Sequence, residues 1–97
     1  MTNEEKKNTL ANLTDLEKQV IITMFDDGFA FDDLNENFMT WGVDGKRERG
    51  ALASLVKKGV VTVEDWGRNA EGYRETPVFV AEGFTKRDLL DAVEYED

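Results

Sequence analysis

Hydrophobic residues recur at helical spacing in the stretch LTDLEKQVIITMFDDG, which covers residues 13–28. Thr14 and Glu17 have the spacing of a capping box, in which each side chain accepts a hydrogen bond from a backbone N–H of the first turn. Gly28 is placed to end the helix in a left-handed conformation. The pattern predicts an amphipathic helix whose apolar face consists of Leu16, Val20, Ile21, Met24 and Phe25.

The next stretch, FAFDDLNENFMTWGV, predicts a second and shorter helix. Phe31, Leu34 and Phe38 fit one face of a helix that starts near Asp32. A carboxylate is favoured at that end because the N-terminus of a helix carries the positive end of its dipole. We expect residues 41–43 to form the turn that follows.

The pattern of polar and apolar positions then changes from a helical period to an alternating one. A third helix is predicted from Asp44, a good N-cap residue, to Gly59. The stretch VVTVEDW, residues 60–66, alternates like a half-buried strand, and YRETPVFVA, residues 73–81, predicts a second strand after a turn. Pro77 indicates that this second strand is an edge strand or is interrupted there.

The C-terminal stretch FTKRDLLDAVEYED predicts a short last helix. Thr85 and Asp88 provide its N-terminal cap. This helix ends in acidic residues, and its apolar positions are Phe84, Leu89, Leu90 and Val93.

Length and composition indicate one folded domain. A chain of 97 residues can bury one hydrophobic core but not two. The 10% aromatic content argues against disorder, because a disordered chain lacks the apolar area that offsets chain entropy. We therefore expect a flexible N-terminal segment at 1–12, a single domain at 13–94 and an acidic tail at 95–97.

The order helix, helix, helix, strand, turn, strand, helix predicts an α+β fold. LASLVKKGVVTVEDW, residues 52–66, resembles the end of a recognition helix that runs into the wing of a winged helix-turn-helix domain. LTDLEKQVI similarly resembles the first helix of MarR-like members, and the resemblance covers about residues 13–80. It implies a three-helix bundle with a two-stranded β-wing and a short C-terminal helix, in a protein that binds DNA through the third helix and the wing. The long terminal helices by which MarR-like proteins dimerise are missing.

Charge is distributed unevenly along the chain. The net charge is −9, yet residues 44–74 contain seven of the twelve Lys and Arg. A strongly acidic protein repels polyanions at long range. The central segment can still present a local basic surface, because salt screens the remaining charges beyond about 8–10 Å.

The helical phase of the third helix indicates which of its residues face outward. With Leu52 in the core and about 100° per residue, Leu55, Val56 and Glu48 fall on the inner side. Gly50 and Ser54 then lie at the centre of the outer side, surrounded by cations. The predicted binding residues are Lys46, Arg47, Gly50, Ser54, Lys57 and Lys58 on the helix, and Arg68, Asn69 and Arg74 from the turn and second strand.

Three interpretations of this face remain open. In the first it enters a DNA major groove, where Lys46 and Arg47 reach base edges or phosphates. In the second, the small residues let another protein pack closely, and the acidic ends of the chain could mimic a nucleic acid. In the third it is a solvated helix face. The carboxylates of Asp32, Asp33 and Glu36 argue against DNA, because in a winged helix they would lie near the duplex.

Enzyme, metal and cofactor chemistry are not expected. The chain has no His and no Cys, so it lacks the usual general base, the usual zinc ligands and any thiolate site. Gly45-Lys46 hints at a phosphate loop, but Arg47 stands where Ser or Thr would bind magnesium. No signal peptide or membrane-spanning stretch is visible, and we expect a cytoplasmic location.

These observations favour a small, cofactor-free, winged-helix regulator of transcription, of the phage or bacterial accessory type, whose partner is double-stranded DNA. The alternative is a non-catalytic adaptor or inhibitor that binds a protein partner. A homodimer is possible through Trp41, the C-terminal helix or the second strand as an edge.

Overall fold

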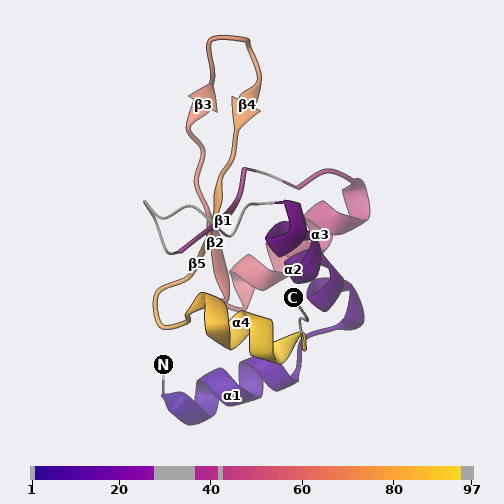
Figure 1. The fold of residues 1–97 in the computed structure, drawn as a ribbon, viewed down its shortest axis with the longest axis vertical. Coiled ribbons are helices and arrows are strands. Elements are labelled where there is room, and N and C mark those ends of the chain that lie inside the picture. Colours follow the sequence, from indigo (N-terminus) through magenta and orange to yellow (C-terminus); the bar gives the residue numbers. More distant parts are fainter. Residues whose placement is uncertain (1, 28–36, 42, 95–97) are drawn as a thin grey trace.

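The structure is a computed structural model that describes residues 2–27, 37–41 and 43–94. Helices and short strands form a mixed α+β arrangement, which confirms the predicted class (Figure 1). Three strands form an antiparallel sheet in the order β1-β5-β2, and a separate two-stranded hairpin, β3-β4, projects from it. The elements are α1 Asn3–Ala11, α2 Asp15–Asp27, β1 Phe38–Thr40, α3 Lys46–Lys57, β2 Val61–Val63, β3 Gly67–Arg68, β4 Arg74–Glu75, β5 Val78–Val80 and α4 Lys86–Ala92.

The hydrophobic core lies between the helices and one side of the three-stranded sheet. α2 contacts α3, β1 and α4, so it occupies the centre of the described part of the molecule. The residues at the centre of the core are almost completely buried: Ile21, Met24, Leu55, Val78 and Leu89. Four of the five apolar positions predicted for α2 are buried and Leu16 is half-buried, which confirms the predicted face.

Both predicted capping boxes are confirmed. The N–H of Thr14 donates to Glu17 Oε1 over 2.8 Å, and the N–H of Glu17 donates to Thr14 Oγ1 over 3.1 Å. Thr85 and Asp88 make the same reciprocal pair at the start of α4, with distances of 2.9 and 3.1 Å. The last predicted helix is therefore present, whereas the acidic tail at 95–97 lies outside the described residues.

The predicted second helix is wrong at its C-terminal end. Phe38–Thr40 forms strand β1, whose three residues are all buried. Phe38 lies opposite Phe79 of β5, so pairing with the sheet prevails over a helical spacing that extended from Phe31. The rest of that prediction, including Asp32, and the predicted stop at Gly28 lie outside the described residues.

α3 differs from its prediction at the start and agrees at the end. Gly45, with φ +95°, is the N-cap, whereas Asp44 was predicted for this role. Glu48 packs directly over Gly45, so a side chain there would need both a strained backbone and a displaced carboxylate. At the other end Gly59 has φ +77°, and its N–H donates to the carbonyl of Val56 over 3.0 Å. The stop at Gly59 was predicted, and the structure shows that it uses a left-handed conformation.

The N-terminal segment contains a helix that the sequence did not predict. Thr2 caps α1 by accepting the N–H of Glu5 over 3.1 Å. None of the residues of α1 is buried, which explains why its sequence has no apolar face to detect. Lys6 connects α1 to α4 through an ion pair with Asp88 of 3.4 Å.

The first predicted strand, residues 60–66, is shorter than expected, since β2 covers only Val61–Val63 and β3 lies in the predicted turn, while the second predicted strand is divided into β4 and β5. β4 ends before Pro77 and β5 begins after it, so the predicted interruption is confirmed. β5 is the central strand of its sheet, however, and the prediction of an edge strand is wrong. In the segment that links the sheet to the hairpin, Glu64 N–H donates to the Pro77 carbonyl and Trp66 N–H to the Glu75 carbonyl.

No helix among the described residues is long and apolar enough to cross a membrane.

Candidate functional site

The outer side of α3 is a stripe of small and cationic residues. Ala51, Leu52 and Leu55 are the buried residues of this helix. The opposite side, at about 100° per residue, therefore passes through residues that are all exposed: Lys46, Gly50, Ala53 and Lys57. The helix is rotated from the predicted phase, since Ala51 is 7% exposed and Val56, expected in the core, is 41% exposed.

Three cations of α3 face solvent without a partner. Lys46, Arg47 and Lys57 are exposed and make no ion pair or hydrogen bond with the described part of the chain. Arg49 was not among the predicted binding residues, yet it is also exposed, and its Nε donates to the Gly45 carbonyl over 3.3 Å. The rotated helical phase places Arg49 beside Lys46, a position that the sequence alone had assigned to the flank.

Lys58 and Ser54 were predicted in the exposed face, and the structure corrects both. Lys58 Nζ lies 2.6 Å from Glu17 Oε1 on α2, and Glu17 is 1% exposed. Ser54 is half-buried. Burial alone would raise the pKa of Glu17, but the hydrogen bonds from Lys58 and the Thr14 backbone, together with the nearby Ser54 hydroxyl, lower it from 4.5 to about 2. Both residues therefore stabilise a buried carboxylate, because they lie on the α2 side of the helix.

The three predicted residues of the hairpin have structural contacts of their own. Arg74 Nη2 lies 2.5 Å from Asp65 Oδ2, and hydrogen bonds from Arg74 and the Gly67 N–H lower the pKa of Asp65. Arg68 Nη1 donates to the Gly72 carbonyl over 2.7 Å. The Oδ1 atom of Asn69 accepts the backbone N–H groups of residues 71 and 73 and so organises the turn.

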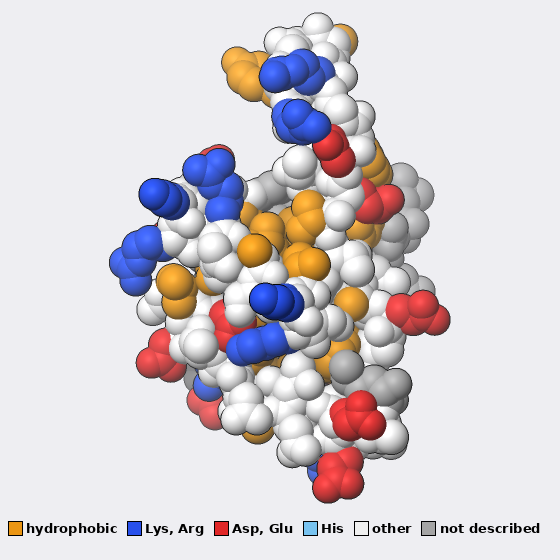
Figure 2. Space-filling view, turned by 180° about the vertical axis from the view of Figure 1, so that it is seen from behind, with side chains coloured by type: hydrophobic (Ala, Val, Ile, Leu, Met, Phe, Trp, Pro, Cys, Tyr) orange, Lys and Arg blue, Asp and Glu red, His pale blue; other side chains and the backbone are white. Residues whose placement is uncertain are grey.

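The hairpin cations lie on the same side of the molecule as α3. Arg68 and Arg74 are opposite each other in the β3–β4 pair. Arg74 and Val78 are four residues apart along one extended chain, and Val78 faces the helices from β5. Figure 2 shows Lys and Arg side chains on the hairpin and over α3 around a hydrophobic area. We call this surface the basic face, and it consists of Lys46, Arg47, Arg49 and Lys57 of α3 with Arg68 and Arg74 of the hairpin.

A pocket next to α3 is too small for a cofactor. It lies between α2, β1 and the start of α3, and its volume is about 140 Å³. Ligand sites usually have about 300 Å³ or more. The described residues contain no group of three or more His, Cys, Asp or Glu that could hold a metal ion. The carboxylates of Asp32, Asp33 and Glu36, which argued against DNA, lie outside the described residues.

Gly50, in the middle of the exposed stripe, provides a test of whether that stripe serves binding or folding. A Cβ added at Gly50 would meet no atom within 4 Å. We expect Gly50→Ala to raise the free energy of unfolding by about 0.5–1 kcal/mol, because glycine disfavours an exposed helix interior. Urea denaturation measures the change, with Ala53→Gly as the matched control of opposite sign. A less stable Gly50→Ala protein would show that the fold itself requires this glycine.

Comparison with known proteins identifies no relative: no family model, no curated protein and no solved structure matches the chain.

Proposed function

We propose that this protein binds double-stranded DNA through the basic face and acts as a small, cofactor-free regulator. In this proposal the architecture is that of a winged helix, with α3 as the recognition helix and the β3–β4 hairpin as the wing. The observation that carries the proposal is the set of unpartnered cations on α3, next to a hairpin whose arginines lie on the same side.

The proposed contacts follow from the chemistry of each position. Gly50 and Ala53 leave room for the helix to approach a groove closely, because neither has a side chain beyond Cβ. Lys46 and Arg47 lie in the first turn of α3 and reach base edges or phosphates, and an arginine can donate two hydrogen bonds to a guanine. Lys57, in the last turn, is placed to contact a backbone phosphate.

The acidic remainder of the chain makes this binding weak and sensitive to salt. The net charge of −9 repels DNA at long range, so the attraction depends on the short-range contacts of the basic face. Neutralising about four phosphates gives a slope of about −3.6 in log K against log salt, and about a hundredfold loss of affinity between 50 and 200 mM salt.

A titration of a fluorescein-labelled, mixed-sequence 20-base-pair duplex at these two salt concentrations tests the proposal. We expect Lys57→Ala to bind several-fold more weakly at low salt and to reduce the salt slope by about 1, as the loss of one phosphate contact predicts. Lys7→Ala is the matched control, because Lys7 is an exposed lysine of α1 outside the basic face. The proposal is wrong if the protein does not bind DNA at 50 mM salt, or if both variants weaken binding equally.

A protein-binding adaptor or inhibitor is the second candidate for the same face. Val56 is 41% exposed beside the small residues of the stripe, which is an arrangement on which an α-helix of another protein could pack. A partner of this kind would carry acidic residues to pair with Lys46 and Lys57. Failure of the DNA titration with an intact fold would favour this candidate.

A further inference from the structure

An aromatic surface lies on the side of the sheet opposite to the helices. Phe38 and Trp41 come from β1 and its end, Trp66 precedes β3, and Phe79 is in β5. The ring centroids of Phe38 and Trp41 are 5.0 Å apart, those of Trp41 and Trp66 are 5.6 Å apart, and Trp66 and Phe79 are separated by 6.5 Å. We call these four residues the aromatic cluster. Trp41 is 54% exposed and Trp66 is 53% exposed, so half of each indole surface is open to a ligand.

The register of the strands explains why the rings gather on this side. Thr62 is opposite Phe79, and side chains alternate along the chain, so Glu64 and Trp66 extend from the Phe79 side of the sheet. Glu75 accepts a hydrogen bond from Trp66 and is also the register partner of Gly67. Two residues therefore oppose one, which is a β-bulge. The bulge leaves Trp66 on the aromatic side while the following Arg68 is on the side of the basic face.

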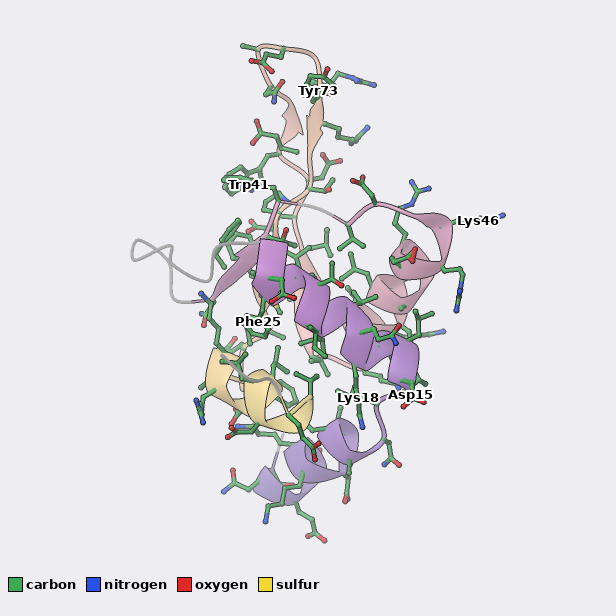
Figure 3. The ribbon with its side chains drawn as sticks, turned by 45° about the vertical axis from the view of Figure 1, so that its right-hand side comes forward. Asp15, Lys18, Phe25, Trp41, Lys46 and Tyr73 are labelled. Carbon is green, nitrogen blue, oxygen red and sulfur yellow. The ribbon has the colours of Figure 1, made fainter. Side chains whose placement is uncertain are left out.

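The aromatic cluster is separate from the α3 part of the basic face and adjoins the hairpin part at Arg74, which lines a groove with Trp41. In Figure 3, Trp41 and Lys46 lie to either side of the base of the hairpin. A ligand of the cluster would therefore leave α3 accessible to DNA.

The size of the cluster decides between a second copy of the chain and a short segment of another protein. Two half-exposed tryptophans offer roughly 200 Å² of apolar surface. A stable interface between folded proteins needs about 800 Å² from each partner. The cluster is thus much smaller than a dimer interface, whereas a pair of tryptophans is sufficient to anchor a few residues of an extended peptide.

The charges beside the cluster indicate the chemistry of the peptide. Glu64 is exposed on the side of Trp66, and Glu75 lines an open groove together with Trp41, Asn69 and Arg74. Arg74 is paired with Asp65, which offsets its charge. The two carboxylates favour a cationic ligand, and the faces of the indole rings attract Lys and Arg as well. The same carboxylates disfavour the phosphates of a single-stranded nucleic acid, which could otherwise stack on the rings.

We propose that the aromatic cluster binds a short extended segment of a partner protein, in which an apolar or aromatic side chain is next to Lys or Arg. The apolar side chain packs between Trp41 and Trp66, and the cation lies near Glu64 or Glu75. This site uses none of the residues of α3, so it can be tested separately from the α3 contacts of the proposed DNA-binding function, although its groove includes Arg74 of the basic face.

A displayed library of random dodecapeptides tests this proposal. The full chain is the bait, and the enriched peptides are then measured one by one by fluorescence anisotropy. We expect enrichment of sequences with an apolar residue beside Lys or Arg. Trp66→Ala should weaken their binding at least tenfold and Glu64→Lys at least threefold. Tyr73→Ala is the matched control, because Tyr73 is a 69% exposed aromatic residue at the tip of the hairpin and should bind like the wild type.

Further measurements keep the result unambiguous. Thermal melting of each variant verifies folding, and Trp66→Phe should retain most of the peptide binding. Lys57→Ala should bind the peptides normally, which separates this proposal from the DNA titration. The proposal is overturned if enrichment does not depend on the tryptophans, if the peptides are not basic, or if Trp66→Ala instead abolishes binding of a dT12 oligonucleotide or dissolves a dimer in sedimentation.

Discussion

Lys58→Ala is expected to lower the free energy of unfolding by about 3 kcal/mol at pH 7, because removal of one partner leaves a buried charge without compensation. The same substitution at the adjacent Lys57 should change it by less than about 0.5 kcal/mol, as for an ordinary surface residue. The two lysines differ in their surroundings: Lys58 Nζ is 2.6 Å from the buried Glu17 carboxylate, and Lys57 is exposed. Urea denaturation of the two variants measures the difference.

A double-mutant cycle assigns the effect to the ion pair. Glu17→Gln keeps a side-chain oxygen that can accept the Thr14 N–H but removes the buried charge. The loss caused by Lys58→Ala should therefore be much smaller in the Glu17→Gln background, with a coupling energy of about 2 kcal/mol. Equal losses in both backgrounds would show that Lys58 contributes through its aliphatic stem, and equal stability of the Lys57 and Lys58 variants would contradict the assignment altogether.

This pair also shows which kinds of feature could be predicted from the sequence. The capping boxes and the C-terminal stop of α3 at Gly59 depend on residues within five positions of one another, and all of them were predicted. The Glu17–Lys58 pair joins residues 41 positions apart. In the sequence Lys57 and Lys58 are equivalent cations, and the packing of α2 against α3 determines which of them is buried against a carboxylate.

The sequence predicted the exposure of some residues of the candidate site and not of others. Lys46, Arg47, Gly50 and Lys57 are exposed on α3 as expected. The errors share a physical cause, because a helical wheel needs a reference residue and Leu52, at the edge of the buried face, was chosen. Ala51 is buried, so the observed buried side of α3 is rotated about the helix axis from the predicted one. Ser54 is therefore half-buried, and Arg49 lies on the outer side.

The aromatic cluster could not be found from the sequence for a different reason. Trp41 and Trp66 are 25 positions apart, and their contact depends on strand register. The register in turn depends on the pairing of Phe38 with Phe79 and on the bulge at Gly67. A helical spacing had included Phe38, so the strand that carries Trp41 to the sheet was not expected. A strand of three residues, such as β1, has too short an alternating pattern to be recognised within a stretch whose apolar residues have helical spacing.

Acid should destabilise the protein through Glu17. The pKa of this carboxyl is about 2 in the folded protein and 4.5 in the unfolded chain. A lowered folded pKa contributes stability that is complete above the unfolded value and is lost as the pH falls from about 4.5 to about 2. The difference corresponds to about 3 kcal/mol. Asp88 has a lowered pKa as well, because its carboxylate accepts the Thr85 N–H and pairs with Lys6, so it adds to the loss in the same direction.

Comparison with Glu17→Gln isolates the part that belongs to Glu17. At pH 6 the wild type should be more stable than this variant, since the ionised carboxylate is paired with Lys58. The difference in free energy of unfolding should shrink steadily below pH 4.5, because the wild type alone must take up a proton at this position when it unfolds. Urea denaturation between pH 6 and pH 2.5 measures both curves. A difference that stayed constant across this range would mean that Glu17 titrates alike in both states, and the ion pair would then contribute no net stability to the packing of α3 on α2.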